Sequence, residues 1–314
     1  MARSITRPRL LFTFKVEDKL LIFSSTQPQN VGGDNCSLVA TRYKDFPKHF
    51  PTENRDDLSN GLACLHGPGR GRRVPIVCNP VTGEFIDLAK VKAAGTERSY
   101  IGYDPIKKKC KVLFLTSYGR HSHVVTFGAK KQRSTIECKR HTGQYGEICI
   151  NAVLYYGAYF RKSKFDRKEY IACYDFMFEK FSFIERDWEM YSVSLFNYKG
   201  KLGAYKFDDN WAKKKLVLWV LEDAEKHKWS KSIFVLSHLY NEKIGHKCYI
   251  VGITSAGEIV FMPVGHVNPN FHLFFYNMER DTCTTVNIKR FEEFKHHSLH
   301  ITTYLDYVEN MMPL

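Results

Sequence analysis

Histidine is the residue type whose spacing in this sequence comes nearest to a metal site. His121 and His123 are separated by one residue, which in a β-strand places both rings on one face. His296, His297 and His300 form a second group near the C-terminus. A zinc site needs three or four ligands, and neither group has a carboxylate or thiol motif at ligand spacing. We therefore expect no metal site.

Catalytic patterns are absent from the sequence as well. It contains no Gly-x-Ser-x-Gly nucleophile turn, no His-Glu-x-x-His motif and no paired carboxylates at catalytic spacing. We expect no catalytic residue, no cofactor and no enzymatic activity.

Nine cysteines are spread from Cys36 to Cys283, and none forms a Cys-x-x-Cys pair. An odd number of scattered cysteines favours reduced, mostly buried thiols over disulfides or a zinc site. This predicts that the protein resides in the cytoplasm or the nucleus.

Positive charge is the second chemical feature: 47 Lys and Arg against 33 Asp and Glu give a net charge of +14. Basic stretches occur at residues 67–73, 107–109, 130–131 and 213–215. Residues 67–73 lack the Lys-Ser/Thr ending of a phosphate-binding loop. Exposed turns are natural places for lysine, so we interpret these stretches as solvated surface. The alternatives are contacts with an acidic protein or with nucleic acid, the latter disfavoured because the charge is dispersed.

Aromatic residues make up 14% of the chain, and together with β-branched residues they favour pleated sheets. Trp188, Trp211, Trp219 and Trp229 could line a binding face, but we expect core packing for at least two of them. The apolar runs are far shorter than the ~20 residues that span a membrane, so we expect no membrane association.

A pair of β-hairpins recurs along the chain. In one series, apolar runs flank turns at 79, 128, 175, 223 and 277. In a second series the turns lie near 61, 106, 151, 199 and 256. Both series advance by about 50 residues, and two hairpins per step make the four strands of one propeller blade.

Five such blades occupy residues 60–290, and the chain ends are predicted to form a sixth. Runs at 10–14 and 20–24 form one hairpin, and the apolar stretch 299–308 completes that blade. Sharing the last blade between both ends would close the ring and hide two strand edges. We therefore predict an all-β, kelch-like propeller of six four-stranded blades, with residues 1–6 as a tail and 7–310 as one domain.

Three segments fit this pattern less directly. Residues 41–59 are interpreted as a long connection between blades. Residues 216–227 have good helix propensity, yet their neighbours in the repeat predict a strand, a turn and a strand. The tail 289–314 could hold a short helix.

At this point the sequence resembles the type 3 F-box-associated domain of plant F-box proteins over essentially its whole length. The stretches that carry the resemblance are RPRLLF at 7–12, NGL at 60–62, CNPVTG at 78–83, IGYDP at 101–105, ICIN at 148–151, LYYG at 154–157, LWVLEDA at 218–224 and ITTYLDYVEN at 301–310.

The resemblance implies the substrate-recognition part of a Skp–cullin–F-box ubiquitin ligase, which binds a target protein and performs no bond chemistry. In that family a helical F-box before this segment binds the Skp adaptor. Only residues 1–6 precede the matching segment here, so we expect the F-box to be absent, with Skp and cullin as partners only if one is present. The alternatives are an enzyme built on a kelch-like propeller and a basic nucleic-acid-binding protein.

Overall fold

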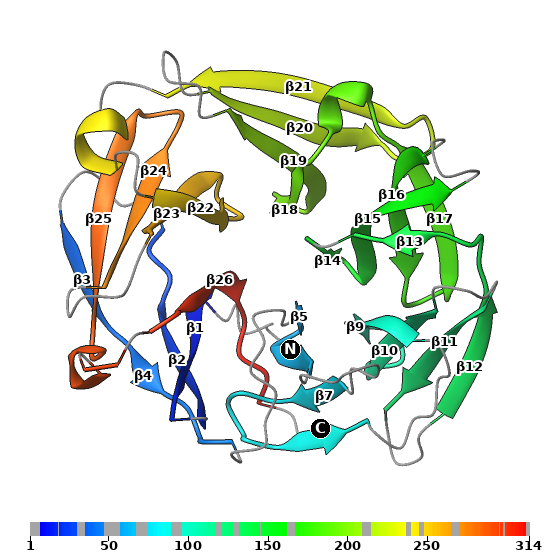
Figure 1. Ribbon diagram of the computed structural model, residues 1–314, viewed down its shortest axis with the longest axis horizontal. Coiled ribbons are helices and arrows are strands. Elements are labelled where there is room, and N and C mark those ends of the chain that lie inside the picture. The colour runs from blue at the N-terminus through cyan, green and yellow to red at the C-terminus, as the bar shows by residue number, and fades with distance from the viewer. Residues whose placement is uncertain are drawn as a thin grey trace.

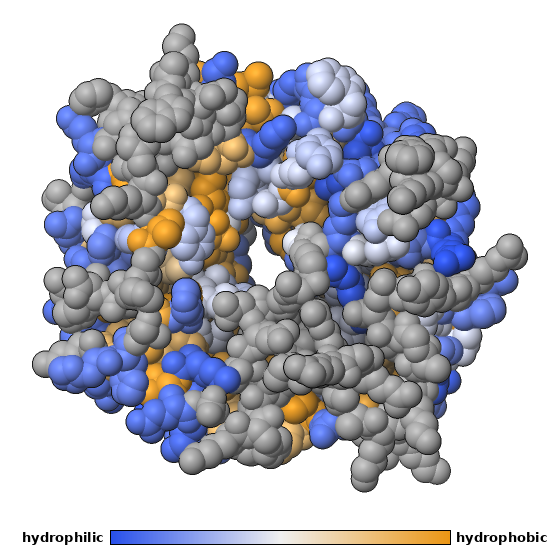
Figure 2. Space-filling model, in the orientation of Figure 1, coloured by the Kyte–Doolittle hydropathy of each residue, from blue (hydrophilic) through white to orange (hydrophobic). Residues whose placement is uncertain are grey.

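Short antiparallel strands make up almost all of the regular structure in the computed structural model (Figure 1). The structure describes residues 7–17, 19–29, 35–46, 57–66, 75–88, 96–116, 121–127, 132–144, 146–161, 167–208, 215–236, 240–244, 248–264, 271–294, 296–297 and 299–311. In these ranges the strands form six sheets arranged as a ring around a central opening (Figures 1 and 2). The predicted all-β, six-bladed propeller is confirmed.

The blades are numbered here in ring order, and their strands are given from the centre outwards. Blade 1 holds β26 (Thr302–Tyr307), β1 (Arg9–Val16), β2 (Lys19–Thr26) and β4 (Thr41–Arg42); blade 2 holds β5 (Asp57–Ser59), β6 (Leu62–His66), β7 (Pro75–Cys78) and β8 (Phe85–Asp87); blade 3 holds β9 (Thr96–Asp104), β10 (Lys109–Thr116), β11 (His121–Thr126) and β12 (Gln132–Glu137).

Blades 4 to 6 complete the ring. Blade 4 holds β13 (Thr142–Gly143) and β14 (Ile148–Ile150), both paired with β15 (Val153–Arg161), then β16 (Arg167–Asp175) and β17 (Lys180–Glu185); blade 5 holds β18 (Ser194–Tyr198), β19 (Lys201–Asp208), β20 (Lys215–Asp223) and β21 (Lys228–Val235); blade 6 holds β22 (Cys248–Ile253), β23 (Glu258–Pro263), β24 (His272–Asn277), β25 (Thr282–Lys289) and β3 (Cys36–Val39). Within the described ranges, three short helices lie between blades: η1 (Trp188–Met190), η2 (Tyr240–Ile244) and η3 (Glu292–Phe294).

Blade 1 closes the ring as predicted, because β26 from the C-terminus pairs antiparallel with β1 from the N-terminus. Asp306 in β26 reinforces the closure. Its Oδ1 accepts hydrogen bonds from Gln27 Nε2 (2.7 Å) and Ser255 Oγ (3.0 Å), and its Oδ2 accepts one from the Ser255 amide (2.7 Å). One carboxylate thus ties both chain ends to blade 6.

Polar side chains stabilise the turns of the hairpins that the sequence repeat predicts. Asp175 Oδ1 accepts hydrogen bonds from the amides of the second and third residues after it, and Asn79, Asp223 and Asn277 do the same in the equivalent turns. This side-chain bond mimics a backbone turn, which is why Asn and Asp recur at these positions. The turn predicted at 128 lies outside the described residues.

Blades 4 and 6 and the segment 41–59 differ from the sequence-based picture. Blade 6 gains a fifth strand, because β3 pairs in parallel with β25, and two strands share the innermost position of blade 4. The segment 41–59 contains β4 and β5 as well as a connection. As the repeat predicts, residues 216–223 belong to a strand despite their helix propensity, because alternate side chains must face the two neighbouring blades. The C-terminal tail holds the 3₁₀ turn η3.

The hydrophobic core consists of six clusters, one at each junction between neighbouring blades. At the junction of blades 1 and 6, Phe12 and Phe23 pack against Phe291 in edge-to-face geometry, with ring centres 5.6 and 5.3 Å apart. Such edge-to-face pairs are a preferred arrangement of buried aromatic rings. Aromatic residues of the sequence thus pack neighbouring blades against one another.

Candidate functional site

The junction of blades 3 and 4 holds a buried ion network. The turn between β16 and β17 reaches across to blade 3, and there the Phe176 ring lies against Gly102. A Cβ at position 102 would come within 2.1 Å of that ring. Only glycine lets the two blades approach this closely.

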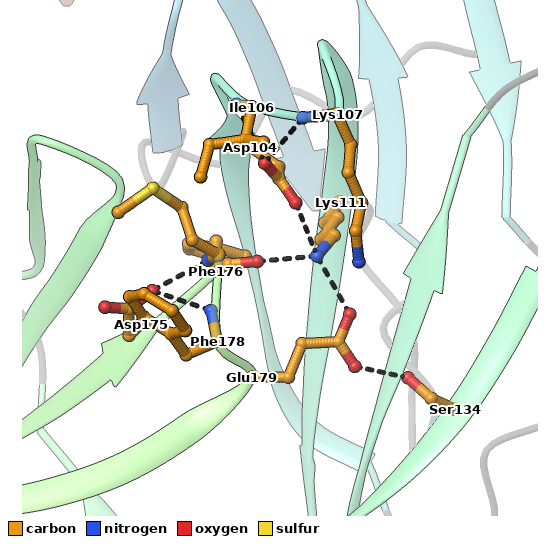
Figure 3. A network of polar contacts seen from close by, with 10 residues as sticks. Asp104, Ile106, Lys107, Lys111, Ser134, Asp175, Phe176, Phe178 and Glu179 are labelled. Atoms are coloured by element: carbon orange, nitrogen blue, oxygen red, sulfur yellow. Dashed lines mark hydrogen bonds and ion pairs between the residues drawn. The ribbon is translucent and has the colours of Figure 1, made fainter.

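Lys111 of β10 is fully buried beneath this turn (Figure 3). Its ammonium group donates to the Phe176 carbonyl at 2.6 Å and lies 3.0 Å from Asp104 Oδ2 and 2.9 Å from Glu179 Oε1. The other oxygen of Glu179 accepts a hydrogen bond from Ser134 Oγ of β12 (2.9 Å). Three partners from two blades therefore surround the buried cation.

The charges in this network hold one another in the ionised form. Burial alone would lower the pKa of Lys111, but the carboxylates of Glu179 and Asp104 outweigh it and raise that pKa. Burial would likewise raise the pKa values of Asp104 and Glu179. Hydrogen bonds prevail and lower both: Asp104 accepts from the Lys107 amide and from Lys111, and Glu179 from Lys111 and Ser134. The network is thus a structural clamp between the blades.

A pocket of about 430 Å³ opens above the clamp. Its lining is strongly basic and consists of Lys107, Lys109, Lys111, Thr126, Gln132, Arg133, Ser134 and Glu179. The Lys111 ammonium group is held by Phe176, Asp104 and Glu179, so the charge offered to a ligand comes from Lys107, Lys109 and Arg133. Such a pocket suits an acidic side chain.

A second pocket, of about 480 Å³, lies on blade 4 next to blade 5. Its walls include the rings of Phe160, Tyr170 and Phe183, and Phe160 lies 4.8 Å from Tyr170 and 4.9 Å from Phe183, measured between ring centres. Lys168 Nζ lies 5.3 Å from the centre of the Tyr170 ring and 2.7 Å from Glu185 Oε1. Aromatic walls with a charged rim are typical of surfaces that bind proteins or peptides.

Comparison with known proteins places this architecture in a family. The family model described as "F-box associated beta propeller domain" matches residues 9–308, which include all six blades. The chain belongs to the F-box associated β-propeller family. The resemblance noted from the sequence is thereby confirmed.

Relatives of this F-box associated propeller are found in Arabidopsis thaliana. F-box protein At1g53790 is 38% identical, over 98% of this chain and 71% of its own length, and F-box protein At3g61340 is 36% identical over 99% and 83%. A third relative, At1g53370, is 44% identical over 99% and 81%. Among solved structures, TolB from Acinetobacter baumannii aligns with a TM-score of 0.46 at 8% identity, over 95% of this chain and 66% of TolB.

The basic stretches of the sequence fall in different places on the propeller. Residues 107–109 form the end of the turn between β9 and β10 and the start of β10, with Lys107 and Lys109 lining the basic pocket. Residues 67–73, 130–131 and 213–214 lie outside the described residues, and Lys215 begins β20. Of the basic stretches in the sequence, residues 107–109 thus contribute two lysines to the basic pocket.

The tryptophans divide between core and surface. Trp219 is buried between blades 4 and 5, and the half-buried Trp229 packs against the same cluster. Trp188 in η1 is 85% exposed. Trp211 lies outside the described residues. The sequence therefore predicted core packing correctly for two of the four tryptophans.

Histidines and cysteines show no sign of a metal centre in the described ranges, where no group of three or more potential ligands comes together. All nine cysteines are free thiols, four of them buried and five half-buried. Burial raises the pKa of Cys110 and of Cys173 to about 12. No helix within the described ranges is long and apolar enough to span a membrane.

Sequence reasoning missed the clamp of Lys111, Asp104 and Glu179. Asp104 lies next to the turn predicted near 106, but in the sequence Lys111 is a single lysine within an apolar strand. A lysine at the inward-facing phase of a strand is the signal that could have revealed it, since buried lysines need charged partners.

Proposed function

We propose that this propeller recognises a target protein for a Skp–cullin–F-box ubiquitin ligase and performs no bond chemistry itself. The observation that carries the proposal is the family match over residues 9–308, together with relatives named F-box proteins that align along nearly the whole chain. A rigid ring with a basic pocket and an aromatic pocket supplies surfaces on which a folded target can dock.

The basic pocket and the net charge of +14 favour a target with an acidic surface. Ubiquitin transfer by a cullin complex and free thiols both fit residence in the cytoplasm or the nucleus.

Target turnover is the direct test. The tagged chain is expressed in Arabidopsis cells, bound proteins are identified, and their half-lives and ubiquitin modification are measured with and without the chain. We expect bound proteins to turn over faster if the chain joins a ligase and more slowly if it shields them. Bound proteins with unchanged half-lives would contradict the proposal.

Ligase membership has a separate test, pull-down of the Skp adaptor with the intact chain. Skp binding would show that this chain joins the ligase itself, whereas no binding would leave the propeller as the part that recognises the target. Because of the net charge of +14, nucleic acid is the alternative class of ligand. A mobility-shift titration with no salt-dependent complex near physiological ionic strength would dismiss it.

A further inference from the structure

Strand β21 forms the outer edge of blade 5 and pairs with β20 alone among the described residues. An outer strand leaves a row of backbone amide and carbonyl groups open to another chain. With eight residues, β21 and β25 are the longest outer strands of the ring. The two edges differ in what covers them.

The edge of β25 is occupied by the chain itself. Strand β3 lies alongside it in parallel, with Val286 opposite Cys36 and Lys289 opposite Val39. The molecule thus already uses strand addition at an outer edge, and β21 presents the same kind of edge without such a cover in the described ranges (Figure 1).

Other outer strands are protected by charge or by shortness. Strand β12 carries Arg133 and Glu137, β17 begins with Lys180 and ends with Glu185, and β4 and β8 have two and three residues. Charged residues and short length discourage pairing with another chain. Strand β21 carries Lys228 and Lys231 in its first half, and its last four residues, Ser-Ile-Phe-Val at 232–235, carry no charge.

Exposed apolar side chains flank this uncharged edge. Ile233 and Val235 are 56% and 59% exposed and point to the same side of the sheet, since they are two residues apart. Lys231, on that side too, pairs with Glu189 of η1, which holds the exposed Trp188 close to β21. Tyr191, which follows η1, is 64% exposed. Figure 2 shows orange and pale surface over these elements at the top of the ring.

The charges near β21 indicate which kind of segment would pair with its open edge. Lys228 begins β21 and interacts electrostatically with Glu222, and Lys215 lies opposite Val235 at the other end of the strand. Both lysines are exposed, and Lys215 forms no ion pair with a described residue. The net charge of +14 disfavours a second copy of this chain. An extended segment with acidic residues near its ends and apolar residues between them fits both lysines and the apolar side chains.

We propose that an extended acidic and apolar segment of the target protein adds to β21 as a fifth strand of blade 5, beside Trp188 and Tyr191. Backbone hydrogen bonds along the edge would supply affinity, and alternate side chains would supply selectivity against Ile233 and Val235. The inference rests on the proposed function, because it names the part of the propeller that grips the target.

Selection from a library of random displayed 12-residue peptides against the intact chain tests the inference. We expect the enriched peptides, once synthesised, to alternate apolar and acidic residues. Their Kd should rise at least tenfold with the double variant Ile233→Ser/Val235→Ser. The matched control is Ile106→Ser, which removes a 73% exposed apolar side chain from a turn of blade 3 and should leave Kd unchanged.

A readout on the peptide is independent of how the variants fold. Methylating peptide amides one at a time should weaken binding at every second residue, because alternate amides of an added strand face β21. Binding should also shift the fluorescence of Trp188, and Trp188→Phe should remove that shift.

Three results would overturn the inference: enriched peptides that bind the double variant equally well, a methylation scan without alternation, or a dimer of the chain in sedimentation that Ile233→Ser/Val235→Ser dissociates. If the double variant still binds and stabilises or destabilises the targets found in cells, the proposed function stands and the assignment to β21 fails. If no bound protein changes its half-life while the peptides bind as expected, the assignment to β21 stands and the proposed function fails.

Discussion

Replacing Lys111 by Met tests whether the buried ion network clamps blades 3 and 4 together. Met keeps most of the apolar stem but removes the ammonium group from Asp104, Glu179 and the Phe176 carbonyl. Removing one partner of a buried ion pair costs about 3–5 kcal/mol, because the remaining charge is left uncompensated. Asp104 is 1% exposed, so water cannot replace the lost partner.

The expected change in melting temperature follows from chain length. An unfolding entropy of about 2.1 cal/mol/K per residue gives roughly 0.7 kcal/mol/K for 314 residues. A loss of about 3–5 kcal/mol therefore lowers Tm by about 5–8 °C.

The pH dependence of the stability lost in Lys111→Met is a second and more specific test of the clamp. In the native protein the pKa values of Asp104 and Glu179 lie below their ordinary range, so both groups stabilise the fold above about pH 4 and lose that effect as the pH falls through their folded pKa values. Without Lys111, burial raises the pKa of Asp104, and protonation then relieves the uncompensated charge. The deficit of Lys111→Met should therefore be largest at neutral pH and shrink towards pH 4.

Urea unfolding followed by circular dichroism at pH 7 and pH 5 measures both effects. Lys206→Met is the matched control, since Lys206 is exposed in the middle of β19, and it should change the free energy of unfolding by less than about 0.5 kcal/mol. A loss below about 1 kcal/mol in Lys111→Met, or a loss that does not vary with pH, would refute the clamp.

Three further predictions concern packing, closure and thiols. Gly102→Ala places a Cβ 2.1 Å from the Phe176 ring and should cost about 1–3 kcal/mol in urea unfolding; an unchanged midpoint would contradict this close approach. Asp306→Ala removes the hydrogen bonds from Gln27 and Ser255 and should cost about 2–3 kcal/mol, with faster amide exchange in β1 and β26 than in β10; equal exchange would argue against its closing role. Cys173 and Cys283 are buried, and burial raises the pKa of their thiols to about 12 and about 11, so both should react with a thiol reagent at pH 8 only after unfolding; rapid reaction in the native state would disprove their burial.

Local patterning in the sequence was enough to predict the propeller. Asn and Asp turn residues recur between alternating apolar runs at a step of about 50 residues, and each of these signals acts over a few neighbouring positions. The pairing of β26 with β1 could also be predicted from the sequence. An otherwise unpaired hairpin at one end of the chain and a lone apolar stretch at the other fit a single missing blade.

Contacts between distant segments were decided only by the tertiary structure. Lys111 and Glu179 lie far apart in sequence, and nothing near either residue indicates that the turn of one blade docks on the next. The addition of β3 to β25 and the exposure of Ile233 likewise depend on how blades twist and pack side by side. Turn chemistry and strand alternation are encoded residue by residue, whereas ion pairs and open edges exist only once the ring has brought separate blades together.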